Sequence, residues 1–131
     1  MRVVNRIFLK SALIACLLHP AVLPQSKSLI FPHPVLEVVG GLTFDFGNIY
    51  RGQRVSHVFI LKNEGSDTLV IKNVSSSCGC TAAITSSMRV PPLSKTELNV
   101  TFNSEGYSGR VSKIVTVTSN DSVNPTLQVS I

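Results

Sequence analysis

Residues 97–103 read ELNVTFN, and polar and apolar side chains alternate strictly along this stretch. Leu98, Val100 and Phe102 fall on one face of an extended chain, and the polar residues fall on the other. A period of two is typical of a β-strand that buries one face and exposes the other to water. The stretch therefore predicts a half-buried strand, and the rest of the fold can be worked outward from it.

The same alternation recurs on both sides of this strand. Short polar clusters rich in Gly, Asn, Ser and Asp separate the apolar stretches about every ten residues, as in sandwiches of short strands. We therefore predict an all-β fold, an antiparallel immunoglobulin-like β-sandwich of about seven strands over residues 40–131. The other expected strands lie near residues 42–46, 55–63, 69–74, 114–118 and 127–131, and we expect Leu127, Val129 and Ile131 to close the core.

The stretch 55–63 is apolar on both of its faces. Phe59 and Leu61 share one face, and Val58 and Ile60 share the other. Either this strand is central and packed on both sides, or Val58 and Ile60 form an exposed patch that meets a partner. We favour the packed strand, because exposed patches are rarer than buried ones.

The N-terminal region has the pattern of an export signal. Arg2, Arg6 and Lys10 come first, an apolar run follows, and no acidic residue interrupts it. The run is shorter than the ~20 residues that span a membrane. Leu13-Ile14-Ala15-Cys16 resembles a bacterial lipobox, in which the cysteine becomes lipidated, although Lys10 shortens the apolar core. We expect residues 1–16 to be a signal segment with Cys16 as lipidation candidate; a plain signal peptide is the alternative.

Residues 17–39 contain Pro20, Pro24, Pro32 and Pro34, which favour extended chain and predict a stiff spacer. The alternative is that a first strand already begins at Leu36. Export would then place the folded domain in the periplasm or at the cell-envelope membrane, in membrane contact only through the N-terminus.

The charge of the chain excludes a common class of partner. The formal net charge is +5, but residues 1–28 carry four basic residues and no acidic one. From residue 29 onward eight basic residues face seven acidic ones, a net charge of +1. Nucleic-acid binding needs a basic stripe against the phosphates, so we expect no nucleic-acid partner.

Cys78-Gly79-Cys80 is the motif that merits a chemical hypothesis. If oxidised, the pair closes a very small ring, which favours a labile disulfide. If reduced, two thiolates suit a soft metal such as copper(I), or one thiolate reacts with a partner. Gly79 can take positive φ, which would bring the two sulfurs together. The structural alternative is two small apolar side chains in a tight turn, with Gly79 fitting the bend. A zinc site would need further ligands, and His33, His57 and Met88 stand at no motif spacing.

Several motifs together resemble a known family. They include Asp45-Phe46-Gly47, Phe59-x-Leu61-x-Asn63-x-Gly65 and Ser77-Cys78-Gly79-Cys80-Thr81, followed by Ser119-Asn120-Asp121. In this order they resemble the bacterial domain of unknown function 1573, itself similar to Hydin-like and major-sperm-protein-like immunoglobulin-type domains. The resemblance spans residues 42–131 and implies this fold and export, but no activity. Pro91-Pro92-Leu93-Ser94 departs from the Pro-Gly turn often found there.

The inventory of catalytic groups is poor. A Ser-His-acid triad would have to use His57, and no nucleophile-elbow sequence or phosphate-binding loop accompanies it. We therefore expect no enzyme, no cofactor and no small-molecule substrate. The leading hypothesis is a non-catalytic interaction domain that binds another protein of the cell envelope through its strand edges. The alternative is a thiol-redox or copper-binding domain that acts through Cys78 and Cys80.

Overall fold

The computed structural model describes residues 32–131, so the predicted signal segment 1–16, with Cys16, and most of the spacer lie outside the described residues. The described chain forms eight strands in two four-stranded antiparallel sheets, which confirms the predicted β-sandwich. No helix that could cross a membrane occurs within residues 32–131. The strands are β1 (Leu36–Val39), β2 (Arg54–Asn63), β3 (Leu69–Ser76), β4 (Thr81–Thr85), β5 (Arg89–Val90), β6 (Lys95–Asn103), β7 (Ile114–Ser119) and β8 (Thr126–Ser130).

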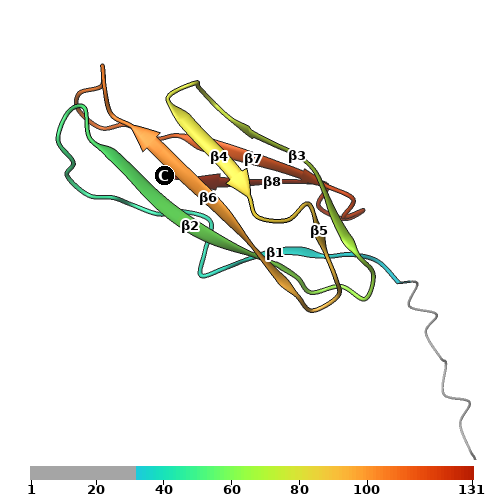
Figure 1. Cartoon of the computed structure of the whole chain (residues 1–131). Helices are drawn as coiled ribbons and strands as arrows, with labels where there is room; N and C mark the ends of the chain where they lie inside the picture. Colours follow the sequence, from blue (N-terminus) through green and yellow to red (C-terminus); the bar gives the residue numbers. More distant parts are fainter. Residues whose placement is uncertain (1–31) are drawn as a thin grey trace, which may run out of the picture.

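The two sheets form the layers of an elongated domain (Figure 1). One sheet has the order β1-β2-β6-β4, and the other has the order β5-β3-β7-β8. The ten residues of β2 set a long axis of about 30 Å. The chain enters at one end, beside β1, and the β3–β4 connection lies at the opposite end (Figure 1).

The core lies between the sheets and follows the predicted alternation. Leu98 and Val100 of β6 are fully buried, and Phe102 is 6% exposed. Val129 is buried, and Leu127 and Ile131 pack against the core cluster, as predicted for the last strand. The other buried members are Leu36, Val38, Phe59, Leu61, Leu69, Ile71, Val90, Val115 and Val117.

The prediction of a first strand at residues 42–46 is wrong. Gly40, Gly41 and Gly47 have positive φ and interrupt extended pairing on both sides of this segment. Only one parallel bridge forms, between Thr43 and Ser130, with Phe44 N–H donating to Ser130 O at 2.9 Å. The first strand is instead β1, within the last residues of the predicted spacer, as the alternative for that stretch had it.

The expectation for the second face of β2 is also wrong in part. The strand is central, since it pairs with β1 and with β6. Its outward side is nevertheless open: Val58 is 39% exposed and Ile60 is half-buried. The outer face of this sheet therefore carries exposed apolar side chains.

Asn63 fastens the N-terminal segment to the sandwich. Its side chain is fully buried and makes four hydrogen bonds. The Oδ1 atom accepts from the N–H groups of Val35 and Gly65 at 3.2 and 3.0 Å. The Nδ2 group donates to Asp67 O and Val90 O at 2.7 and 2.9 Å. One amide therefore joins the segment before β1 to the β2–β3 turn and to β5.

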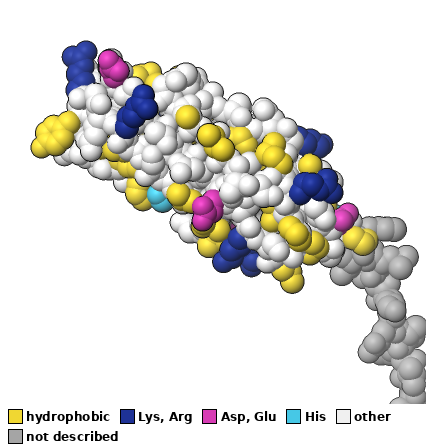
Figure 2. Space-filling model, viewed as in Figure 1, with side chains coloured by type: hydrophobic (Ala, Val, Ile, Leu, Met, Phe, Trp, Pro, Cys, Tyr) yellow, Lys and Arg dark blue, Asp and Glu magenta, His cyan; other side chains and the backbone are white. Residues whose placement is uncertain are grey.

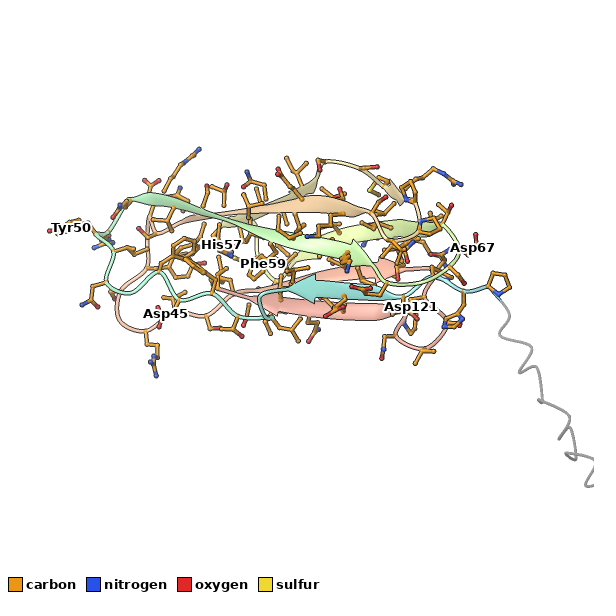
Figure 3. The ribbon with its side chains drawn as sticks, turned by 90° about the horizontal axis from the view of Figure 1, so that it is seen from below. Asp45, Tyr50, His57, Phe59, Asp67 and Asp121 are labelled. Atoms are coloured by element: carbon orange, nitrogen blue, oxygen red, sulfur yellow. A yellow bond between two sulfur atoms is a disulfide. The ribbon has the colours of Figure 1, made fainter. Side chains whose placement is uncertain are left out.

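Asp121 holds the same segment from the other sheet (Figure 3). Its Oδ2 atom accepts from Leu36 N–H at 3.0 Å, and Oδ1 accepts from Val123 and Asn124 at 2.9 and 3.0 Å. Burial opposes ionisation and raises the pKa of this carboxyl, but these three hydrogen bonds and the charge of nearby His33 lower it. The net pKa of Asp121 lies below its ordinary value, so the ionised form fits the fold.

Candidate functional site

Cys78 and Cys80 are joined by a disulfide in the β3–β4 connection, with their Cα atoms 5.4 Å apart. Both side chains are partly exposed. The expectation that Gly79 takes positive φ is wrong, since Gly79 is absent from the left-handed residues of the described chain. The turn is instead held by Ser76, whose hydroxyl donates to Cys78 O at 2.9 Å and to Thr81 O at 2.6 Å.

Two hydroxyl groups face the sulfur atoms. The Tyr107 hydroxyl donates to Cys80 Sγ at 3.1 Å and lies 3.9 Å from Cys78 Sγ. The Oγ1 atom of Thr81, a residue 3% exposed, lies 3.8 Å from Cys80 Sγ and 3.9 Å from Cys78 Sγ. Two hydroxyl groups therefore lie beside the sulfur atoms and could donate hydrogen bonds to a thiolate there.

Tyr107 comes from the loop between β6 and β7, which meets the β3–β4 connection at this end of the domain (Figure 1). Its ring packs against Phe102, with centroids 5.6 Å apart. The Lys113 ammonium lies 4.3 Å from the ring centroid, a cation–π contact. These two contacts hold the ring whose hydroxyl meets the sulfur atoms.

The sequence identified both cysteines but missed Tyr107. Tyr107 lies in the polar turn between the strands β6 and β7, 27 residues from Cys80, and no local spacing connects the two. An aromatic residue inside an otherwise polar turn was the available signal, because such a ring usually packs against something.

A disulfide between residues two apart adds little to stability. The chain-entropy relation gives about 1.5 kcal/mol for so small a loop, against ~3 kcal/mol for a loop of about 15 residues. The disulfide therefore contributes little to the stability of the fold. A small, partly exposed ring is on the other hand open to attack by a thiolate.

The metal hypothesis gains no further ligands. Within residues 32–131 no group of three His, Cys, Asp or Glu side chains is placed to hold a metal ion. His57 points into the sandwich beside Phe59 (Figure 3) and stacks on Phe44 with ring centroids 3.6 Å apart. Burial lowers the pKa of His57 because the apolar surroundings disfavour the imidazolium. Its contacts are those of a packed ring.

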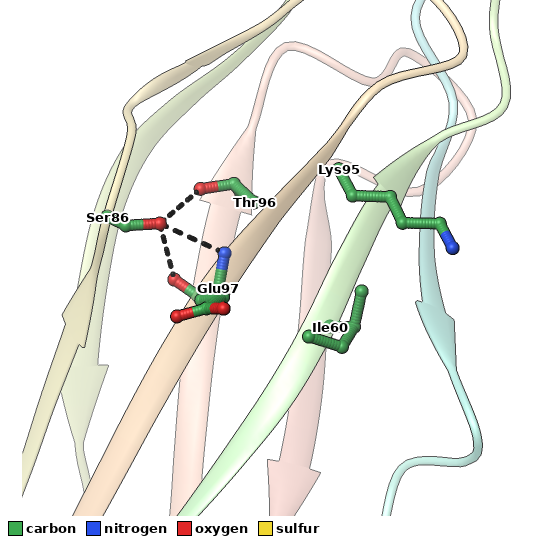
Figure 4. Close-up of a pocket in the computed structure, with 5 residues that line it drawn as sticks. All are labelled: Ile60, Ser86, Lys95, Thr96 and Glu97. Carbon is green, nitrogen blue, oxygen red and sulfur yellow. Dashed lines mark hydrogen bonds between the residues drawn. The ribbon is translucent and has the colours of Figure 1, made fainter.

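The outer face of the first sheet is the second candidate site. Val58 and Ile84 flank Asn99 in one row across β2, β6 and β4, and Ile84 is 71% exposed. Figure 2 shows apolar side chains in small clusters over this side of the molecule, with charged side chains around them. A shallow hollow nearby is lined by Ile60, Ser86 and Glu97, among others (Figure 4). There the Ser86 hydroxyl lies 3.0 Å from Thr96 Oγ1, so the hollow's polar groups pair with each other.

The fold and these sites define an antiparallel β-sandwich with a partly exposed Cys-x-Cys disulfide in a strand connection. The model of the family described as protein of unknown function (DUF1573) matches residues 39–131, and the chain belongs to this family. The resemblance read from the sequence is thereby confirmed. No curated protein matches the chain.

A solved structure supports the fold. The crystal structure of a protein of unknown function from Porphyromonas gingivalis W83 superposes with a TM-score of 0.67 at 17% sequence identity. The match covers 76% of this chain and 46% of that one, so this chain spans less than half of its length. At this identity the likeness concerns the fold alone.

Proposed function

We propose that this domain is a non-catalytic interaction module on the exported side of a bacterial membrane, and that it binds another envelope protein through the free edge of β4. The observation that carries this proposal is the character of β4. The strand pairs with β6 on one side, has no strand on its other side among the described residues, and reads TAAIT. It contains no charge and no proline, which are the usual devices that protect an edge from pairing.

The other sheet edges are less open. Thr43 and its neighbours bond to Ser130 and cover part of β8. The strand β5 has two residues, and β1 has four, with exposed Glu37 among them. A partner strand added to β4 would bond to its free N–H and C=O groups and would meet Ile84 with its side chains.

Export is supported by the disulfide, because disulfides persist in oxidising compartments outside the cytosol. Anchoring through Cys16 belongs to the same proposal. A Cys16→Ser variant is expected to leave the membrane fraction and to lose the mass of the lipid. Unchanged fractionation and mass would contradict anchoring at this residue.

The binding proposal is tested by site-specific photocrosslinking in the native envelope. A photoreactive amino acid replaces Ile84 in one protein and Val123 in a control, since both side chains are 71% exposed. Val123 lies between β7 and β8, away from the β4 edge. We expect a discrete adduct from position 84 that is absent from position 123 and that disappears in an Ala83→Pro background. Cys80 O and Ser86 N–H bond to β6, and these bonds alternate along an antiparallel strand, so Ala83 N–H lies on the free edge. The same adducts from both positions would refute binding at β4.

A second function, thiol exchange, is favoured by one specific observation: the Tyr107 hydroxyl donates to Cys80 Sγ at 3.1 Å. Under this proposal the Cys78–Cys80 disulfide oxidises the thiols of a partner. Incubation with reduced glutathione should open the disulfide within minutes while the fold persists. A disulfide that stays closed until the protein unfolds would contradict this function.

A further inference from the structure

The two sulfur atoms of the disulfide have different surroundings. The Tyr107 hydroxyl is 3.1 Å from Cys80 Sγ and 3.9 Å from Cys78 Sγ. Thr81 Oγ1 is nearly equidistant from them, at 3.8 and 3.9 Å. The asymmetry therefore comes from Tyr107, whose ring is held by Phe102 and Lys113.

We propose that the disulfide opens in one direction: an incoming thiolate attacks Cys78 Sγ, and Cys80 leaves as the thiolate that Tyr107 stabilises. This inference rests on the thiol-exchange function proposed above. The partner sulfur forms a new bond to Cys78 Sγ as the bond between the two cysteines breaks. The electron pair of the broken bond passes to Cys80 Sγ. The disulfide is itself the oxidant, so no further reagent is needed.

Tyr107 favours this direction because negative charge appears on the leaving sulfur only as the bond breaks. A hydrogen bond to an anionic acceptor is about twice as strong as one to a neutral acceptor. Tyr107 therefore stabilises the transition state and the Cys80 thiolate more than it stabilises the closed disulfide. The Lys113 ammonium lies 4.3 Å from the Tyr107 ring centroid and adds positive charge beside this ring.

The geometry also predicts which sulfur remains with the partner. Cys78 would carry the mixed disulfide until a second thiol of the partner attacks the partner's own sulfur. That attack forms the partner's disulfide, and Cys78 leaves as a thiolate, so the protein ends with both cysteines reduced. Cys80 directly precedes buried Thr81, whose N–H bonds to Cys78 O at 3.3 Å, so the Cys80 thiolate stays close to Cys78. Its return to Cys78 Sγ would reverse the first step and release the partner still reduced.

The test uses the oxidised full-length protein with reduced glutathione as the probe thiol. The reaction is stopped with N-ethylmaleimide, and tandem mass spectrometry locates each adduct. We expect glutathione on Cys78 and N-ethylmaleimide on Cys80 in at least about a fivefold excess over the reverse arrangement. Glutathione found mainly on Cys80, or equally on both, overturns the inference. A disulfide that does not open at all overturns the thiol-exchange function itself.

A pair of tyrosine variants tests the cause. Tyr107→Phe removes the hydroxyl and keeps the ring that packs on Phe102, so circular dichroism should be unchanged. We expect about a five- to tenfold slower opening and a loss of the preference for Cys78. Tyr50→Phe is the matched control, since Tyr50 is 85% exposed and its ring makes no contact with the disulfide site in the described structure. Opening of the Tyr107→Phe protein at the wild-type rate refutes the role of the hydroxyl.

Discussion

Replacing Asn63 with alanine should lower the free energy of unfolding by about 5 kcal/mol. The substitution keeps the backbone of β2 and removes one amide group that no solvent reaches. Four backbone groups would lose their hydrogen-bond partner at once, because the side chain serves two donors and two acceptors.

The magnitude follows from where these groups lie. The bonds to Gly65 N–H and to Val90 O are buried, and a stranded group in such a place costs about 1–3 kcal/mol. The bonds to Val35 N–H and to Asp67 O are partly buried, so water can replace the amide there at about 0.5 kcal/mol each. A domain of this size has a total stability of about 5–15 kcal/mol, so the variant stays folded only marginally.

The measurement is equilibrium unfolding in urea followed by far-UV circular dichroism, since the chain contains no tryptophan. At an unchanged slope the midpoint should fall by about 2–3 M urea. The control is Asn99→Ala on the exposed face of β6, which should change stability by less than about 0.5 kcal/mol. A loss below about 1 kcal/mol for Asn63→Ala would refute the reasoning that this amide joins the three segments.

Three further predictions concern other positions. Gly65→Ala should lower the free energy of unfolding by more than about 2 kcal/mol, because a Cβ atom there would overlap His33 O and lie 2.6 Å from Val35 N. The control is Gly79→Ala, whose Cβ atom would meet nothing within 4 Å and which should leave stability unchanged in urea unfolding. Leu93→Gly should raise stability by about 0.5–1 kcal/mol in thermal melting, because Leu93 has φ 59° in the Pro91–Ser94 turn, where a side chain is strained. The pKa of Asp121 is lowered in the fold, so its ionised form stabilises the protein above about pH 4. This contribution is lost as the pH falls further. The free energy of unfolding of the Asp121→Asn variant should therefore depend less on pH between about pH 5 and pH 2.

The sequence predicts best those strands in which buried and exposed positions differ clearly in polarity. In β6 and β7 most inward residues are apolar, except Thr96 and Ser119 at the strand ends, and their neighbours are mostly polar, so period two is visible without knowing the partner strands. In contrast, β4 consists of small and uncharged residues, and β5 has two residues. Their strand conformation depends on β6 and β3, whose distance along the chain no local pattern encodes.

The candidate site was predictable to the same extent. The Cys-x-Cys spacing identifies the two sulfurs, because residues two apart need only a turn to meet. The third group, Tyr107, reaches Cys80 only because the β6–β7 loop folds back, with Tyr107 N–H donating to Ser104 O at 3.1 Å. The two cysteines, which are neighbours in the sequence, could therefore be predicted as a site, whereas Tyr107, which only the fold brings to them, could not.

The motif residues divide between the two ends of the domain. Asn63, Gly65 and Asp121 all hold the segment that leads into β1, and packing explains each of them. The Cys78–Cys80 disulfide lies at the opposite end (Figure 1) and contributes little to stability. If the N-terminus is a membrane tether, this end faces away from the membrane.

The free edge of β4 begins at Thr81, directly after Cys80, so a strand that pairs with β4 would bring its own side chains beside the disulfide. Binding at the edge and thiol exchange are therefore compatible in one partner, and crosslinking at Ile84 and adduct mapping at Cys78 report on them separately.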